Sequence, residues 1–89
     1  MKAVITVTGR DSVGIIASVS ALCTKHNANI VEITQSVLSE YFAMIMVVEI
    51  DALSIPFADF AELLAKTGRE AALDIRAMHE DIFNTMHHI

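Results

Sequence analysis

The sequence predicts an α+β fold in which a four-stranded antiparallel sheet carries two helices on one face. Four segments have the apolar alternation or the continuous apolar character of strands, and two others repeat apolar residues at helical spacing. Their order is strand, helix, strand, strand, helix, strand. With right-handed crossovers, this order places both helices on the same face of the sheet.

The first strand and helix are predicted over residues 2–8 and 13–26. In the strand both parities are at least partly apolar, which is typical of a central strand covered on its second face as well. Asp11 or Ser12 is expected to cap the helix, and Asn27 to close it in the left-handed conformation. The apolar face of the helix comprises Ile15, Ile16, Val19, Leu22 and Cys23.

The next two strands are predicted as a hairpin over residues 29–38 and 41–48, joined by Ser39 and Glu40. In the first of them Val31, Ile33 and Val37 are expected to be buried, and Gln35 interrupts this parity. The second is apolar on both parities, so one of its faces needs a cover other than the helices. A partner subunit is the obvious candidate.

The second helix is expected to follow Ser54 as N-cap, with Pro56 in its first turn. It ends at Gly68, or it continues to Ala72, since a glycine inside a helix costs only about 1 kcal/mol. A fourth strand follows over residues 73–78. The whole is the ferredoxin-like βαββαβ arrangement over residues 1–78. Its second helix is expected to bury a stripe of Phe57, Phe60, Ala61 and Leu64, with Leu63 as a further candidate.

The C-terminal segment, residues 79–89, is predicted to form a short amphipathic helix outside this arrangement. Such a short helix is ordered only where its apolar face finds a surface. It either caps its own sheet or crosses to a neighbour, and we favour the second because the core is small. We therefore expect a homodimer held through the sheet side. The apolar residues of the segment are Ile82, Phe83, Met86 and Ile89.

Composition excludes several classes of protein. The chain of 89 residues has 6 basic and 11 acidic residues, a net charge of −5, so nucleic-acid binding through phosphate contacts is not expected. No apolar run reaches the roughly 18 residues of a membrane helix. The N-terminus has no signal-peptide pattern, and the cytoplasm is the default location. Cys23 is the one cysteine, is expected to be buried, and excludes an internal disulfide.

The residues also give no catalytic or metal site. No Ser/His/Asp or Cys/His arrangement with recognisable spacing is present, so an enzyme is not expected. The histidines lack the spacing of a zinc site, and we expect neither a metal nor a cofactor. The four histidines are His26, His79, His87 and His88.

The turn between the first strand and the first helix, residues 8–16, is the segment most suggestive of function. Gly14 leaves the first helical turn bare, so an anion could approach the free backbone N–H groups. The alternative is that the segment holds only a helix cap and a packing glycine.

The residues Val7-Thr8-Gly9-Arg10-Asp11-Ser12-Val13-Gly14-Ile15-Ile16-Ala17, with Asn29-Ile30 and the order of elements, resemble the ACT domain, a small-molecule-sensing module of amino-acid metabolism. The resemblance covers residues 1–78. The tail over residues 79–89 further resembles the stand-alone ACT proteins of the UPF0237 family, which are similar to the regulator of the glycine cleavage system. Many ACT domains carry Gly where this chain has Asn27, and Asn can adopt the same conformation.

The resemblance implies a ligand site between the first strand–helix turn of one subunit and the second strand of its neighbour. There the helix N-terminus would hold an amino-acid carboxylate, Asp11 or a carbonyl the ammonium, and Ile15 and Ile30 the side chain. It implies a non-catalytic regulatory module that signals to a partner enzyme or regulator; the alternative is a ligand-free interaction module. The implied ligand residues are Arg10, Asp11, Ser12, Val13, Gly14, Ile15, Ile16, Asn29, Ile30 and Val31.

Overall fold

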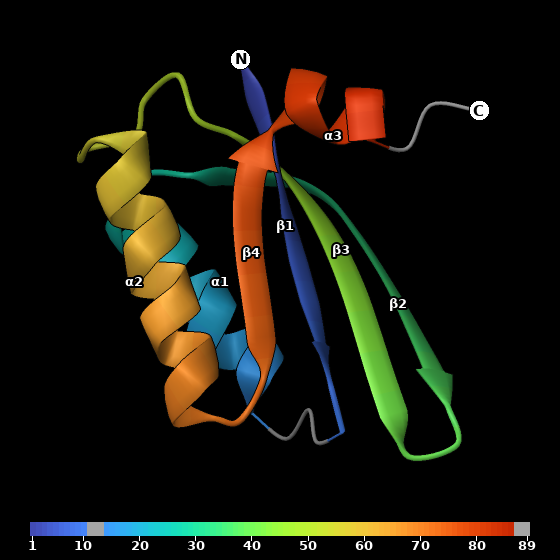
Figure 1. Cartoon of the computed structure of the whole chain (residues 1–89). Coiled ribbons are helices and arrows are strands. Elements are labelled where there is room, and N and C mark those ends of the chain that lie inside the picture. Colours follow the sequence, from blue (N-terminus) through green and yellow to red (C-terminus); the bar gives the residue numbers. More distant parts are fainter. Residues whose placement is uncertain (11–13, 87–89) are drawn as a thin grey trace.

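The computed structural model describes residues 1–10 and 14–86 of the chain. It confirms the predicted order of strands and helices and the short helix after the last strand (Figure 1). Residues 87–89 of the predicted tail helix lie outside the described part. The elements are β1 (Lys2–Gly9), α1 (Ile15–Lys25), β2 (Asn29–Leu38), β3 (Tyr41–Glu49), α2 (Phe57–Glu70), β4 (Asp74–His79) and α3 (Glu80–Met86).

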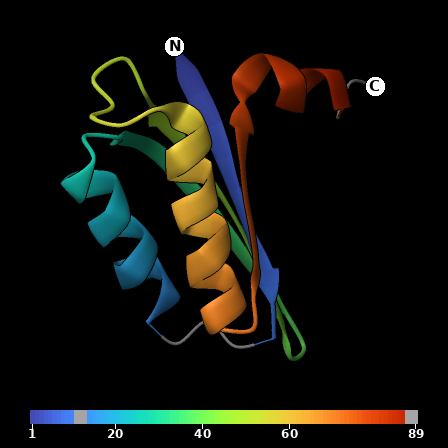
Figure 2. The same cartoon turned by 60° about the vertical axis from the view of Figure 1, so that its left-hand side comes forward.

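The four strands form one antiparallel sheet in the order β2-β3-β1-β4. This confirms the ferredoxin-like arrangement and the central place of β1. Figure 2 shows α1 and α2 on one side of the sheet and α3 on the other, where α3 contacts β1 and β4. We call these the helix face and the open face. The two ends of the sheet are named the α3 end and the turn end, the latter at the β2–β3 turn.

The core lies between the sheet and the two long helices. Alternate residues of β1 and β3 point toward the helices, as their apolar alternation predicts. Cys23 is fully buried among them, which confirms its interpretation as a small hydrophobic residue, and this burial raises the pKa of its thiol to about 11. The fully buried large side chains are Phe60, Ile5, Met44, Met46, Leu64, Val7, Val19, Val48 and Cys23.

Both helices begin differently from the prediction. The N-cap of α1 is Gly14 and that of α2 is Pro56, and neither position has a side-chain capping hydrogen bond. The prediction of Ser54 as N-cap was wrong: its backbone N–H instead donates to the His26 carbonyl at 2.9 Å, which ties the β3–α2 connection to the end of α1. At the other end α2 continues through Gly68 to Glu70.

The expected burial of one face of β2 was wrong. Val31, Ile33 and Val37 are 48, 40 and 70% exposed. β2 is an edge strand, and residues 31–37 are all exposed. Its ladder with β3 also has a bulge between Ile30 and Glu32, which leaves Val31 without a partner in the pairing register.

Candidate ligand-binding site

The turn after β1 leads to the exposed N-terminus of α1. Of the predicted site residues there, Asp11, Ser12 and Val13 lie outside the described residues. Arg10 is exposed, with its guanidinium carbon 5.7 Å from the centre of the Tyr41 ring and a nitrogen 3.9 Å from a carboxylate oxygen of Glu40. The positively charged side chain of Arg10 therefore lies at the turn end of the sheet, where only weak surface interactions hold it.

Gly14 adopts the left-handed conformation at φ 76°, ψ −6°. A Cβ placed on it would meet no atom within 4 Å, so glycine is needed here for its backbone conformation and not for lack of space. The Gly14 carbonyl accepts hydrogen bonds from the Ser18 backbone N–H at 3.0 Å and the Ser18 hydroxyl at 3.1 Å. Gly14 itself has no side chain that could cap the first backbone N–H groups of α1, so the N-cap position does not compete with a ligand for them.

The two isoleucines that follow have different surroundings. Ile15 is 3% exposed and belongs to the core, whereas Ile16 is half-buried and packs at the edge of that core. At this turn Ile16, not Ile15, offers apolar surface to a molecule bound at the helix N-terminus.

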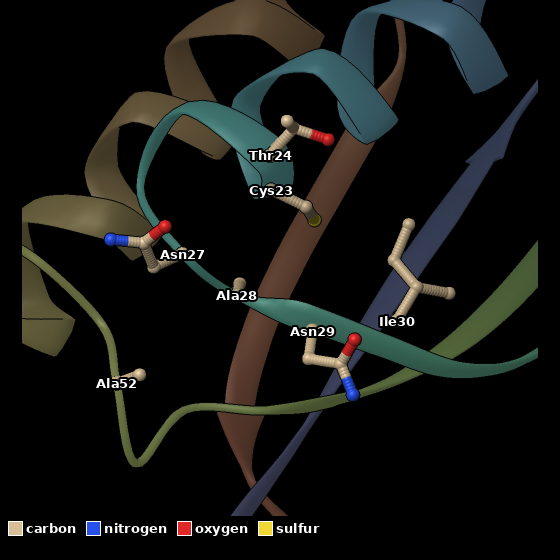
Figure 3. A pocket seen from close by; sticks show the side chains of 7 residues that line it. All are labelled: Cys23, Thr24, Asn27, Ala28, Asn29, Ile30 and Ala52. Carbon is tan, nitrogen blue, oxygen red and sulfur yellow. The ribbon is translucent and has the colours of Figure 1, made fainter.

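The remaining site residues, Asn29, Ile30 and Val31, begin β2 at the opposite end of α1. Asn27, with φ 63°, confirms the predicted left-handed residue, and the Ala28 N–H donates to the Cys23 carbonyl at 2.8 Å, so the chain reverses tightly into β2. Beside this reversal lies an open cavity of about 530 Å³ (Figure 3). It is lined by Cys23, Thr24, Asn27, Ala28, Asn29, Ile30 and Ala52.

Within one chain the two groups of site residues are not brought together. Gly14 and Asn29 lie at opposite ends of α1, a helix of 11 residues and so about 16 Å in length. The predicted helix over residues 13–26 already implied this separation, because Gly14 lies at its start and Asn29 follows its end. A site that combines both groups requires a second chain.

The sequence did not reveal a second, mostly apolar cavity of about 310 Å³ at the turn end. The sequence feature that could have indicated this cavity is the apolar character of both faces of β3. Tyr41 and Ala43 belong to the face that points away from the helices. The lining residues are Thr8, Gly9, Ser36, Tyr41, Phe42 and Ala43.

Two further features bear on the site's chemistry. Over residues 1–10 and 14–86, no three His, Cys, Asp or Glu side chains gather in a way that could hold a metal ion. In the same part of the chain, no helix has both the length and the apolar character needed to cross a membrane.

Comparison with known proteins agrees with this architecture. The model of the ACT domain family matches residues 2–78. A UPF0237 protein of Clostridium perfringens is 43% identical over 89 residues, which span both chains completely. The structure of an ACT domain protein from Streptococcus pneumoniae superposes with a TM-score of 0.80 and 37% identity over 93% of each chain.

A structure described as a glycine cleavage system transcriptional repressor shares the fold, with a TM-score of 0.69 and 23% identity over 86% of this chain and 44% of that one. The UPF0237 and ACT domain families are regulatory rather than catalytic in kind. These matches, with the βαββαβ sheet described above, establish that the chain belongs to the ACT domain family and, within it, to the UPF0237 proteins.

Proposed function

We propose that the chain is a non-catalytic regulatory module that binds an amino acid between two copies of itself and passes the bound state to a partner enzyme or regulator. The observation that carries the proposal is the N-cap of α1 at Gly14, which bears no capping side chain, with the other ligand residues at the far end of the same helix. Each copy thus holds two different halves of one site, and two copies together would form two complete sites.

The edge strand β2 offers a way to bring the halves together. It has ten residues, of which Glu32 alone is charged, and it contains neither Lys nor Pro. A long edge without such protection is a template for another strand. A second copy paired to β2 by a two-fold axis runs antiparallel to it, so the start of one β2 meets the end of the other.

The end of β2 lies where β1 also ends, since Gly9 and Val37 are both paired with Phe42. The β1–α1 turn of one copy therefore approaches Asn29, Ile30 and Val31 of the other. In the joined site, the α1 N–H groups donate hydrogen bonds to the carboxylate of the amino acid, and Asp11 or a backbone carbonyl accepts hydrogen bonds from its ammonium group. Ile16 of one copy and Ile30 of the other flank its side chain.

Thermal unfolding in the presence of each of the twenty amino acids tests ligand binding. A ligand at about 100 times its dissociation constant adds roughly 2.7 kcal/mol to the free energy of unfolding and raises Tm accordingly. The absence of a shift with all twenty would refute the amino-acid part of the proposal and favour the alternative, a ligand-free interaction module.

Two variants connect binding to the site. Gly14→Val places a branched side chain over the α1 N–H groups and strains the left-handed backbone there, so it should lower Tm without ligand and abolish the ligand-induced shift in the protein that remains folded. Ala58→Val, at an exposed position of α2, is the matched control and should keep the shift. A folded Gly14→Val protein with unchanged affinity would exclude the α1 N-terminus as the site.

A further inference from the structure

We infer that the open face of the sheet is a second self-interface, in which α3 of one copy packs against the turn end of another and the two sheets run in opposite directions. This contact is distinct from pairing through β2 and does not depend on a bound ligand.

The open face is covered at one end and bare at the other. At the α3 end Val4 is 3% exposed although it points away from the helix-face core, and α3 contacts β1 and β4 there. Toward the turn end, Ile45 and Tyr41 on β3 are 42 and 52% exposed. The apolar parity of β3 on this face is thus left uncovered by the chain's own α3.

At one end of this face α3 forms a projecting apolar ridge, and at the other end the surface is hollowed. α3 exposes Ile82 by 52% and Met86 by 63%, and residues four positions apart share one side of a helix. The hollow is the 310 Å³ cavity at the turn end, where Tyr41 and Ala43 contribute apolar surface. One copy therefore carries both a projecting apolar helix and a hollow of matching character.

The position of α3 selects the relative direction of the two copies. If the sheets faced each other in the same direction, α3 would meet α3, and these two helices would hold the bare regions apart. If the sheets run in opposite directions, each α3 lies over the turn end of the other copy. The same contact then forms twice about a two-fold axis, as in a closed homodimer interface.

Charge favours the same direction. The α3 end has an acidic excess, because Glu49, Glu80 and Asp81 outnumber Lys2 there. Among the described residues on this face of the turn end, two arginines balance two acidic residues. When the two sheets run in opposite directions, the acidic first turn of α3 lies near the arginines of the other copy. If the sheets ran in the same direction, the two acidic ends would lie against each other. These described residues of the turn end are Arg10, Glu40, Asp74 and Arg76.

The face is also large enough for a stable contact. The molecule is a slab with extents of 36 × 33 × 19 Å, and the sheet lies along its broad side. A specific interface needs roughly 800 Å² from each partner. A second copy can bury that area here, including the exposed large apolar side chains that the structure describes on this side: Tyr41, Ile45, Ile82 and Met86.

Sedimentation equilibrium of the full chain and of two charged variants tests the interface. Ile45→Asp places a carboxylate on the bare part of β3, and Ile82→Asp places one on α3. Each variant should have half the mass of the native assembly and an unchanged circular dichroism spectrum. Ala58→Asp, on the exposed side of α2, is the control and should keep the native mass. Equal masses for the native chain and both face variants would overturn the inference.

Disulfide trapping tests the direction. A chain carrying both Ala43→Cys and Met86→Cys should form covalent pairs on mild oxidation, while Met86→Cys alone should form none. Cys23 is fully buried and does not compete. Trapping by Met86→Cys alone, or an unpaired or internally bridged double variant, would contradict the arrangement. Val37→Asp, aimed at the β2 edge, should leave this trapping intact and so separates this contact from the one in the proposed function.

Discussion

Gly68 offers the most direct test of how tightly α2 packs on β4. It is a buried glycine inside α2, and its carbonyl accepts the Leu73 N–H at 2.8 Å just before β4 begins. A Cβ on Gly68 would lie 2.8 Å from the Leu73 carbonyl oxygen and 2.8 Å from Cγ1 of Ile75. Both distances are well inside ordinary van der Waals contact.

The replacement Gly68→Ala has two opposing effects on the free energy of unfolding. Alanine inside a helix is better than glycine by about 1 kcal/mol. The overlap costs about 1–3 kcal/mol, because the Leu73 oxygen belongs to the backbone and β4 is held by its pairing with β1. We expect the overlap to dominate and Gly68→Ala to lose about 1 kcal/mol net.

Urea unfolding followed by circular dichroism, at one protein concentration, measures this change. Ala65→Gly, at a nearby interior position of α2, is the control for the propensity term and should lose about 1 kcal/mol. If Gly68→Ala instead gains about 1 kcal/mol, the contact with β4 yields freely and the packing argument is refuted.

Three further outcomes follow from particular residues. Burial raises the pKa of the Cys23 thiol to about 11, so as the pH rises the thiol ionises in the unfolded chain before it does in the folded chain. The free energy of unfolding should therefore fall between about pH 9 and pH 11, by roughly 1.4 kcal/mol per pH unit. A Cys23→Ala chain should lack that slope in the same titration. Leu64→Ala removes a fully buried side chain and should cost about 2–5 kcal/mol in urea unfolding. Ala72 has φ 58°, so Ala72→Gly should raise Tm, by relieving about 1 kcal/mol of strain; a lowered Tm would contradict this.

The strands and helices could be predicted because their apolar spacing is local. The bounds of β2 agree with the prediction, and both helices were found, since each pattern repeats several times within one element. Helix caps were harder. Ser54 has the side chain of an N-cap, but its place is set by a backbone hydrogen bond to His26, which no local pattern contains.

The burial of β2 could not be predicted for a related reason. An alternating strand has the same sequence whether helices cover it or it lies at the edge beyond them, and the order β2-β3-β1-β4 decides which holds. Among the predicted ligand residues, the separation of Gly14 from Asn29 follows from the length of the predicted helix, but the choice between Ile15 and Ile16 does not. Both lie on the apolar side of that helix, and only the packing of α1 on the sheet decides that Ile15 is buried and Ile16 partly exposed.

The two edges of the sheet are unequal, and this has a consequence for assembly size. If β2 of one molecule paired with β4 of the next, every addition would leave the same two edges free, and an open-ended ribbon would grow. β4 has six residues against ten in β2, carries Asp74 and Arg76, and runs directly into α3. Such an edge is a poor template for further strands. When β2 of one molecule pairs with β2 of another, each molecule uses the edge that can accept a further strand, and only the β4 edges remain free. The continuous sheet therefore stops growing once two molecules have joined.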